Sequence, residues 1–123
     1  MANSQFKSRK KVTGKKYVEF RKKRAMDAEG TSALTNIGKQ RVKLKRTRGG
    51  NTKKSLLSTD FVNVFENGKT TKLQILSVVD NPANINWTRR NIISKGSIVK
   101  TEKGDVKITS RPGQTGTLFG VFI

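Results

Sequence analysis

Hydrophobic residues gather in the second half of the chain, where they form short runs rich in β-branched and aromatic side chains. Two of these runs, Phe61–Glu66 and Thr70–Val79, are separated by Asn67-Gly68, and Asn81-Pro82 follows the second run. An Asn-Gly pair between two apolar runs is a strong signal of a β-hairpin, because both residues tolerate positive φ. The pattern therefore predicts a hairpin whose second strand ends just before the proline.

A second hairpin is predicted closer to the C-terminus. Ser97–Thr101 and Asp105–Ser110 flank a turn at Lys103-Gly104, and apolar and polar residues alternate along the second of these strands. Such alternation is typical of a half-buried strand. We expect Arg111–Gly116 to be a loop and Thr117–Ile123 to be a final strand. Short strands with tight turns predict an all-β fold, in the form of a small antiparallel barrel-like domain.

The first third of the chain has a weaker pattern. A helix over Tyr17–Ala28 would have a poor apolar stripe and mutually repelling cations, so we expect residues 1–30 to lack a fixed structure until they bind a partner. Thr31–Asn36 is predicted to be a linker. Basic and apolar residues alternate over Arg41–Arg48. This alternation predicts a strand of the β domain with its charged face turned outward.

The expected organisation is a basic RNA-binding extension with its linker, residues 1–34, followed by a β-barrel-like domain, residues 35–123. The chain has 27 Lys and Arg against 8 Asp and Glu, which gives a net charge of +19 and a pI near 11.0. Residues 1–54 hold 18 of the basic residues and three acids. A net charge of this size opposes self-association and favours binding to a polyanion. The candidate polyanions are RNA, DNA and an anionic membrane. Since no clean amphipathic helix supports a membrane partner, nucleic acid is preferred.

The extension itself carries ten Lys and Arg between Lys7 and Arg24. Many positive charges on a flexible chain can neutralise phosphates and release their counterions, and this does not depend on a particular spacing of the charges. A solvated tail or a nuclear localisation run is the alternative, but the density of charge favours nucleic-acid binding. Phe6, Tyr17 and Phe20 are interleaved with the cations, and they either stack on unpaired bases or anchor the extension on the domain.

A second basic cluster follows at Arg46–Asn51, with Lys53 and Lys54 after it. Gly49 and Gly50 allow a sharp turn and a close approach of the backbone to a phosphate, while the neighbouring Arg forks can grip its oxygens. The alternative is an ordinary turn between two strands, and both roles are compatible. The Gly-Lys-Ser/Thr ending of a nucleotide-binding loop is missing, so nucleotide hydrolysis is not expected.

The remaining chemistry is sparse. Trp87, beside Arg89 and Arg90, either stacks on a base or belongs to the core of the domain; if the segment is extended, the two Arg side chains point to opposite faces. The chain has no Cys and no His, and no pair of carboxylates is predicted to converge. We therefore expect no enzyme activity, no metal site and no cofactor. No stretch approaches the roughly 20 apolar residues that cross a bilayer, and no signal peptide is apparent, so a cytoplasmic location is expected.

Several of these stretches occur together in a known family. The chain carries Arg9–Lys16, Asn36-Ile37-Gly38, Arg46–Asn51 and Val78–Asn84 in this order. In these motifs it resembles, over essentially its whole length, the archaeal form of small-subunit ribosomal protein eight of the archaeal and eukaryotic series. The resemblance implies an all-β, barrel-like domain with extensions laid along small-subunit ribosomal RNA (rRNA). The chain is short and lacks the insertion that the eukaryotic members carry near the end of the domain, which suits an archaeal source.

The expected function is therefore that of a structural constituent of the small ribosomal subunit. A related eukaryotic ribosome-assembly factor shares the domain, so transient binding to precursor rRNA is the alternative. The expected partners are small-subunit rRNA and neighbouring small-subunit proteins, with no membrane and no small-molecule substrate. The residues predicted to contact RNA are Arg9, Lys10, Lys11, Lys15, Lys16, Arg21, Lys22, Lys23, Arg24, Arg41, Lys43, Lys45, Arg46, Arg48, Gly49, Gly50, Asn51, Lys53 and Lys54.

Overall fold

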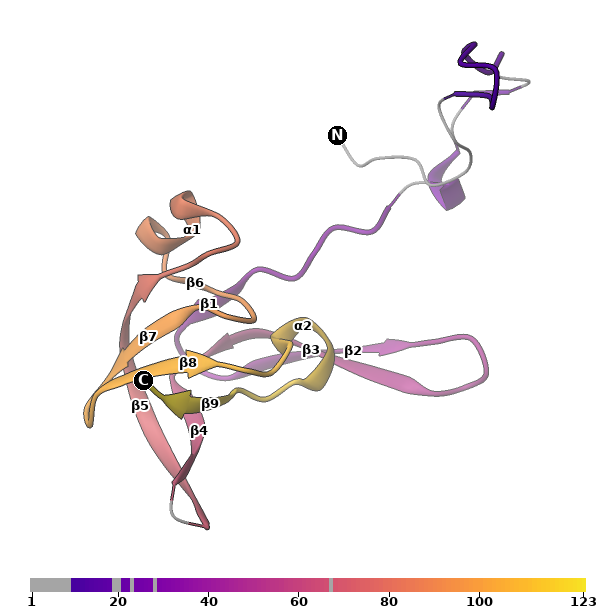
Figure 1. Cartoon of the computed structure of the whole chain (residues 1–123). Coiled ribbons are helices and arrows are strands. Elements are labelled where there is room, and N and C mark those ends of the chain that lie inside the picture. Colours follow the sequence, from indigo (N-terminus) through magenta and orange to yellow (C-terminus); the bar gives the residue numbers. More distant parts are fainter. Residues whose placement is uncertain (1–9, 19–20, 23, 28, 67) are drawn as a thin grey trace. The chain divides into compact units, whose positions relative to one another are not determined.

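The computed structural model describes residues 10–18, 21–22, 24–27, 29–66 and 68–123. The chain divides into two units, Met1–Ser32 and Ala33–Ile123, and each is described by itself (Figure 1). In the first unit, the described residues contain one 3₁₀ turn, η1 (Ala25–Asp27), and none of them is buried. The described part of this basic extension is therefore non-globular, as the sequence predicted.

The second unit consists of short strands with two single-turn helices between them (Figure 1). Its elements are β1 (Thr35–Ile37), β2 (Arg41–Arg46), β3 (Thr52–Thr59), β4 (Phe61–Glu66), β5 (Lys69–Asp80), α1 (Ile85–Arg89), β6 (Ile92–Ile93), β7 (Ile98–Thr101), β8 (Asp105–Ile108), α2 (Pro112–Thr115) and β9 (Phe119–Phe122). The predicted all-β class is confirmed. Both predicted hairpins are also confirmed, as β4–β5 and β7–β8.

Five strands close into a barrel in the order β4-β5-β7-β8-β9. Neighbours pair antiparallel except at the seam, where β9 runs parallel to β4 with Gly120 opposite Val64. A Cβ atom at Gly120 would lie 2.4 Å from a methyl carbon of Val106 and 2.9 Å from the Lys107 carbonyl oxygen. Glycine at this position therefore lets the last strand approach its neighbours closely enough to complete the barrel.

The core of the barrel follows the alternation of apolar residues along the strands. Val62 and Val64 on β4 are fully buried, and so are Val106 and Ile108 on β8 to within 1% exposure. The intervening residues face outward, as expected for a strand with one buried face. The buried cluster comprises Leu56, Val62, Val64, Leu73, Ile75, Val78, Ile93, Val99, Val106, Ile108 and Leu118.

A second sheet, in the order β2-β3-β1-β6, adjoins the barrel. Its central strand β1 runs parallel to β3 and antiparallel to β6. The Thr35 side chain is fully buried, and its hydroxyl donates a 2.7 Å hydrogen bond to the Leu56 carbonyl. The prediction that Thr31–Asn36 is entirely linker was thus wrong for its last two residues. A strand of three residues is too short to show a period in the sequence.

Two segments outside the predicted strands are helical. Arg111–Gly116, expected to be a loop, contains α2, which starts at Pro112, ends at Thr115 and is followed by Gly116 with φ of 73°. Proline in the first turn and a left-handed glycine after the last are the residues that favour a short helix here. The Trp87 segment forms α1, whose first turn is capped by the Asn84 side chain accepting from the Asn86 N–H at 2.9 Å. Arg89 therefore does not lie on an extended strand.

The motif that ends β5 has a structural role. Asn81 is 2% exposed, and its amide nitrogen donates to the Ile92 carbonyl at 2.9 Å. Its side-chain oxygen accepts from the Ser94 hydroxyl at 2.9 Å and from the Ala83 N–H at 3.1 Å. The bonds with Ile92 and Ser94 tie the end of β5 to β6 across α1, and the bond from Ala83 closes the turn after β5, so the Asp80–Asn84 stretch is accounted for by the fold.

Candidate nucleic-acid interface

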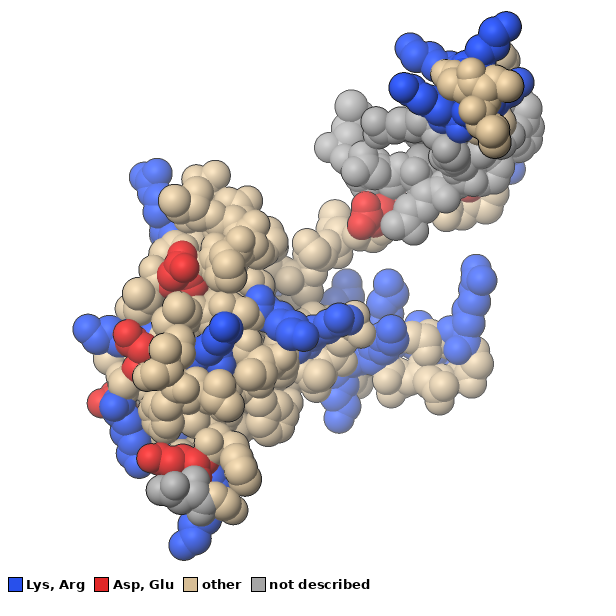
Figure 2. All heavy atoms as spheres, in the orientation of Figure 1, with Lys and Arg blue, Asp and Glu red and all other residues tan. Residues whose placement is uncertain are grey.

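The strands β2 and β3 of the second sheet form a hairpin that extends beyond the short β1, and its described surface carries many of the predicted RNA-binding residues (Figures 1 and 2). All six residues of β2 are exposed, including the apolar Val42 at 41% and Leu44 at 65%. The predicted strand over Arg41–Arg48 is therefore present, but its apolar face is not buried. Among the described strands, β2 is an edge strand that pairs only with β3.

The tip of the hairpin is a turn closed by its own backbone. The Thr47 N–H donates to the Asn51 carbonyl at 2.7 Å, and the Gly50 N–H donates to the Thr47 carbonyl at 3.3 Å. Gly49 and Gly50 have φ of 87° and 84°, and a Cβ atom added to either would have nothing within 4 Å. Glycine is therefore needed at these two positions for its positive φ and not for lack of space, and a ligand can approach the backbone there. Arg48 is exposed beside them.

The register of the strands assigns the cations to two faces. Lys45 lies directly opposite Lys53, and Lys43 lies opposite Ser55, so these three lysines share one face. Leu44 lies opposite Lys54 and Arg46 lies opposite Thr52, on the other face. Figure 2 shows the Lys and Arg side chains spreading from the hairpin in more than one direction. The hairpin therefore presents positive charge on both faces.

The base of the hairpin is held by α2. The Ser55 hydroxyl donates a 2.6 Å hydrogen bond to the Gly113 carbonyl, and Lys54 forms a parallel bridge with Thr115. A Cβ atom at Gly116 would lie 2.7 Å from the Lys54 Cβ, so the stem of this lysine packs closely on the helix end. The segment that was expected to be a loop therefore fixes where the hairpin leaves the domain.

The charge of this hairpin is not balanced locally. Residues 39–59 contain eight Lys and Arg and no Asp or Glu. Like charges directly opposite on neighbouring strands destabilise a sheet, and Lys45 with Lys53 is such a pair. Lys39 belongs to the same acid-free stretch and is exposed, although the sequence prediction did not include it. Its place at the start of this acid-free basic stretch is the feature of the sequence from which Lys39 could have been predicted as a site residue.

In the extension, four of the predicted lysines are brought together by a tight turn. Lys10 and Lys16 form an antiparallel bridge, and the Lys11 N–H donates to the Lys15 carbonyl at 2.8 Å. The Lys11 ammonium also lies 5.8 Å from the centre of the Tyr17 ring. This contact lies within the extension, so it does not distinguish between the two roles predicted for the aromatic residues, which are stacking on unpaired bases and anchoring the extension on the domain. Arg9 and Lys23, like Phe6 and Phe20, lie outside the described residues.

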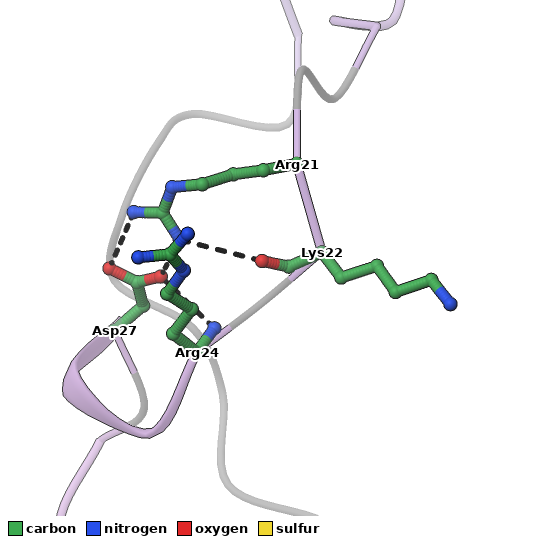
Figure 3. Close-up of polar contacts among 4 residues, drawn as sticks. All are labelled: Arg21, Lys22, Arg24 and Asp27. Carbon is green, nitrogen blue, oxygen red and sulfur yellow. Dashed lines mark hydrogen bonds and ion pairs between the residues drawn. The ribbon is translucent and has the colours of Figure 1, made fainter.

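Arg21 is engaged within the extension (Figure 3). Its two terminal nitrogens donate to the two carboxylate oxygens of Asp27 at 2.5 and 3.2 Å, and the Arg24 N–H adds a 3.2 Å bond to the same carboxylate. The hydrogen bonds from Arg21 hold the pKa of Asp27 below its usual value. The Lys22 side chain points away from this ion pair. Arg21 therefore already has an anionic partner, whereas Lys22 is directed outward.

Other kinds of site find little support in the described part of the chain. Its residues include no group of three or more His, Cys, Asp or Glu side chains placed to hold a metal ion. None of the described helices is long and apolar enough to span a membrane. Trp87 is half-buried on α1, so it is neither a core residue nor a freely exposed ring. The hairpin remains the strongest concentration of predicted site residues.

Comparison with known proteins identifies the family of the chain. Residues 4–123 match the family model described as ribosomal protein S8e. The small ribosomal subunit protein eS8 of Methanobrevibacter smithii is 43% identical over 125 residues, covering 100% of both chains. That of Nanoarchaeum equitans is 46% identical over 91% of this chain and 90% of its own, and that of Methanosarcina barkeri is 45% identical over 94% of both. The chain therefore belongs to the ribosomal protein S8e family.

Proposed function

We propose that this protein is a structural constituent of the small ribosomal subunit and binds rRNA mainly through contacts of Lys and Arg with phosphates. The observation that carries the proposal is the acid-free hairpin, with Lys45 directly opposite Lys53 on exposed strands. Such an arrangement is unfavourable in water alone and becomes favourable when a polyanion supplies the opposite charge. The relatives named as small-subunit proteins support the ribosome as its location.

The proposed contacts use two elements in different ways. The strands of the hairpin are already paired, so its Arg41, Lys43, Lys45, Arg46 and Arg48 meet phosphates at a smaller cost of ordering the backbone than the extension does. Gly49 and Gly50 at its tip permit close approach of the backbone. The basic extension contributes further charge, and its ordering on RNA costs free energy that the contacts must offset. Phosphate contacts position the protein, with the shape of the RNA rather than its base sequence selecting the site.

The decisive experiment is sedimentation of a cell lysate on a density gradient after a high-salt wash, with the protein followed by immunoblot. We expect the protein in mature small subunits and in translating ribosomes. Confinement to immature particles would replace the proposal with the assembly-factor function. Release to the top of the gradient would contradict both functions, because a structural constituent remains bound when loosely held proteins are washed off.

A second experiment separates the two binding elements. Deleting residues 1–24 should weaken binding to small-subunit rRNA and flatten its dependence on salt, because fewer counterions are released. The β domain should stay folded, since Ala33–Ile123 forms its own compact unit. Circular dichroism checks the fold, and binding is measured at several salt concentrations. An unfolded truncated protein, or one with an unchanged salt dependence, would contradict the proposed division.

A further inference from the structure

A stripe of exposed aromatic and aliphatic side chains lies on the outer face of the barrel, along β4 and β9. Phe65 is 63% exposed, Phe119 47%, Val121 43% and Phe61 37%. They lie on the face of the strands opposite the buried Val62 and Val64, and none of them belongs to the buried core cluster. A contiguous apolar patch on a small protein commonly marks a binding surface.

The strand register makes this stripe continuous. Because β9 runs parallel to β4 with Phe119 paired to Asn63, the Phe119 ring lies on the neighbouring strand between Phe61 and Phe65. Two residues further along, Phe65 and Val121 occupy the next outward position of the same two strands. Phe61 and Phe65 are about 13 Å apart along their strand, at about 3.3 Å per residue. Three rings thus line one seam of the barrel.

Cations flank the stripe on both sides. On β5, Lys72 pairs with Asn63, and its ammonium lies 4.2 Å from the centre of the Phe61 ring. On β8, Lys107 pairs with Val121. Beside the middle of the stripe, the outward positions hold Thr70, Lys72 and Gln74 on β5 and Lys107 on β8, whereas the acidic Asp105 of β8 lies beside Ile123, at the end of the stripe. Such a surface is complementary to a partner that carries both negative charges, which the lysines can bind, and flat apolar groups, which can pack on the rings.

We propose that the β4/β9 stripe is a stacking platform for unpaired bases of single-stranded RNA. Every base offers a flat π face to an aromatic ring, and lysines on either side can meet the phosphates that connect stacked bases. A second copy of this chain is a poor occupant, because a net charge of +19 opposes self-association. The inference rests on the proposed function only in taking RNA as the partner, since it concerns a different surface and a different kind of contact.

The test compares two probes of equal length, about ten nucleotides: oligoadenylate and an oligomer of abasic ribose phosphates. Both carry the same phosphates, but only the first can stack. Binding of the full chain is followed by fluorescence anisotropy. Phe65→Ala and Phe119→Ala should each weaken binding of oligoadenylate by roughly 5- to 100-fold and leave binding of the abasic oligomer unchanged. Leu76→Ala, at an exposed apolar residue on β5, is the matched control and should change neither.

Phe65→Leu distinguishes stacking from simple apolar contact. Stacking predicts that leucine behaves like alanine, because it has no π face. Full affinity with leucine would overturn the proposal and favour docking of a protein surface, and so would equal affinity of the wild type and the alanine variants for oligoadenylate. Unfolding followed by Trp87 fluorescence checks each variant. If Phe119→Ala unfolds, the more exposed Phe65 carries the test alone.

The outcome is separable from that of the proposed function. If the stripe is not a platform but the hairpin binds phosphates, both probes still bind with a strong dependence on salt, and the phenylalanine variants behave as wild type. If the wild type binds neither probe nor small-subunit rRNA, both the platform and the proposed function are overturned.

Discussion

Replacing Lys53 with glutamate should stabilise the β2–β3 hairpin and at the same time weaken its binding to RNA. In the wild type, Lys53 lies directly opposite Lys45, and both are exposed. Lys53→Glu replaces a repulsive cross-strand pair with an attractive one. It also removes one positive charge from the surface that we propose meets phosphates. The two effects have opposite signs, so a general loss of structure cannot imitate them.

The magnitude follows from the cross-strand geometry. For charges about 7 Å apart in water, Coulomb's law gives about 0.6 kcal/mol, and screening at 0.1 M salt halves this to about 0.3 kcal/mol. Changing repulsion into attraction therefore stabilises the hairpin by about 0.6 kcal/mol. In binding, the loss of one phosphate contact at 0.1 M salt costs about eightfold in affinity and lowers the salt slope by about 0.9. The new carboxylate adds repulsion, so eightfold is the minimum.

Hydrogen exchange is the suitable assay for stability, because the exposed end of a hairpin opens locally without unfolding of the barrel. Amides of β2 and β3 near the tip should exchange about threefold more slowly in Lys53→Glu. Binding to small-subunit rRNA is measured over a range of salt concentrations. Lys95→Glu makes the same change in net charge at an exposed residue away from the hairpin, and it should affect binding less. Faster exchange at the tip, or an affinity equal to that of the control, would refute the reasoning.

Three further predictions concern the fold and the extension. Gly120→Ala places a methyl group 2.4 Å from a Val106 carbon and should destabilise the barrel by about 1–3 kcal/mol in urea unfolding. Asn81→Ala removes three hydrogen bonds from a buried site and should cost about 1–3 kcal/mol in the same assay. Since Arg21 lowers the pKa of Asp27, the ion pair should be fully formed above the ordinary carboxyl pKa and lost as the pH falls through the lower, folded value. Titration by NMR should show this, and Arg21→Gln should raise the Asp27 pKa.

The hairpins of the barrel could be predicted because local signals and packing agree. Alternation along Asp105–Ile108 and the Asn67-Gly68 pair each identify a strand or turn without knowledge of the rest of the fold. β1 could not be predicted, because its three residues are held by long-range pairing with β3 and β6. The parallel pairing of β4 with β9 could not be predicted either, because these strands lie far apart in the sequence. The aromatic stripe depends on that seam, so it could not be predicted either.

The charged cluster of the hairpin was predicted as a set of residues, but its geometry was not. The sequence predicted a strand over Arg41–Arg48 with its charged face turned outward, and the structure leaves Val42 and Leu44, on the other face, exposed as well. A two-stranded hairpin without a buried face is marginally stable by itself, and here the strands also carry unbalanced charge. Its base is nevertheless fixed by the bond from Ser55 to Gly113 and by the packing of Lys54 on Gly116. A projecting element that is anchored at one end and unfavourable in isolation suits a surface whose missing interactions come from RNA. We therefore propose that the hairpin sets the position of the protein on its target, and that the basic extension, with no buried residue among those described, adds affinity once that position is taken.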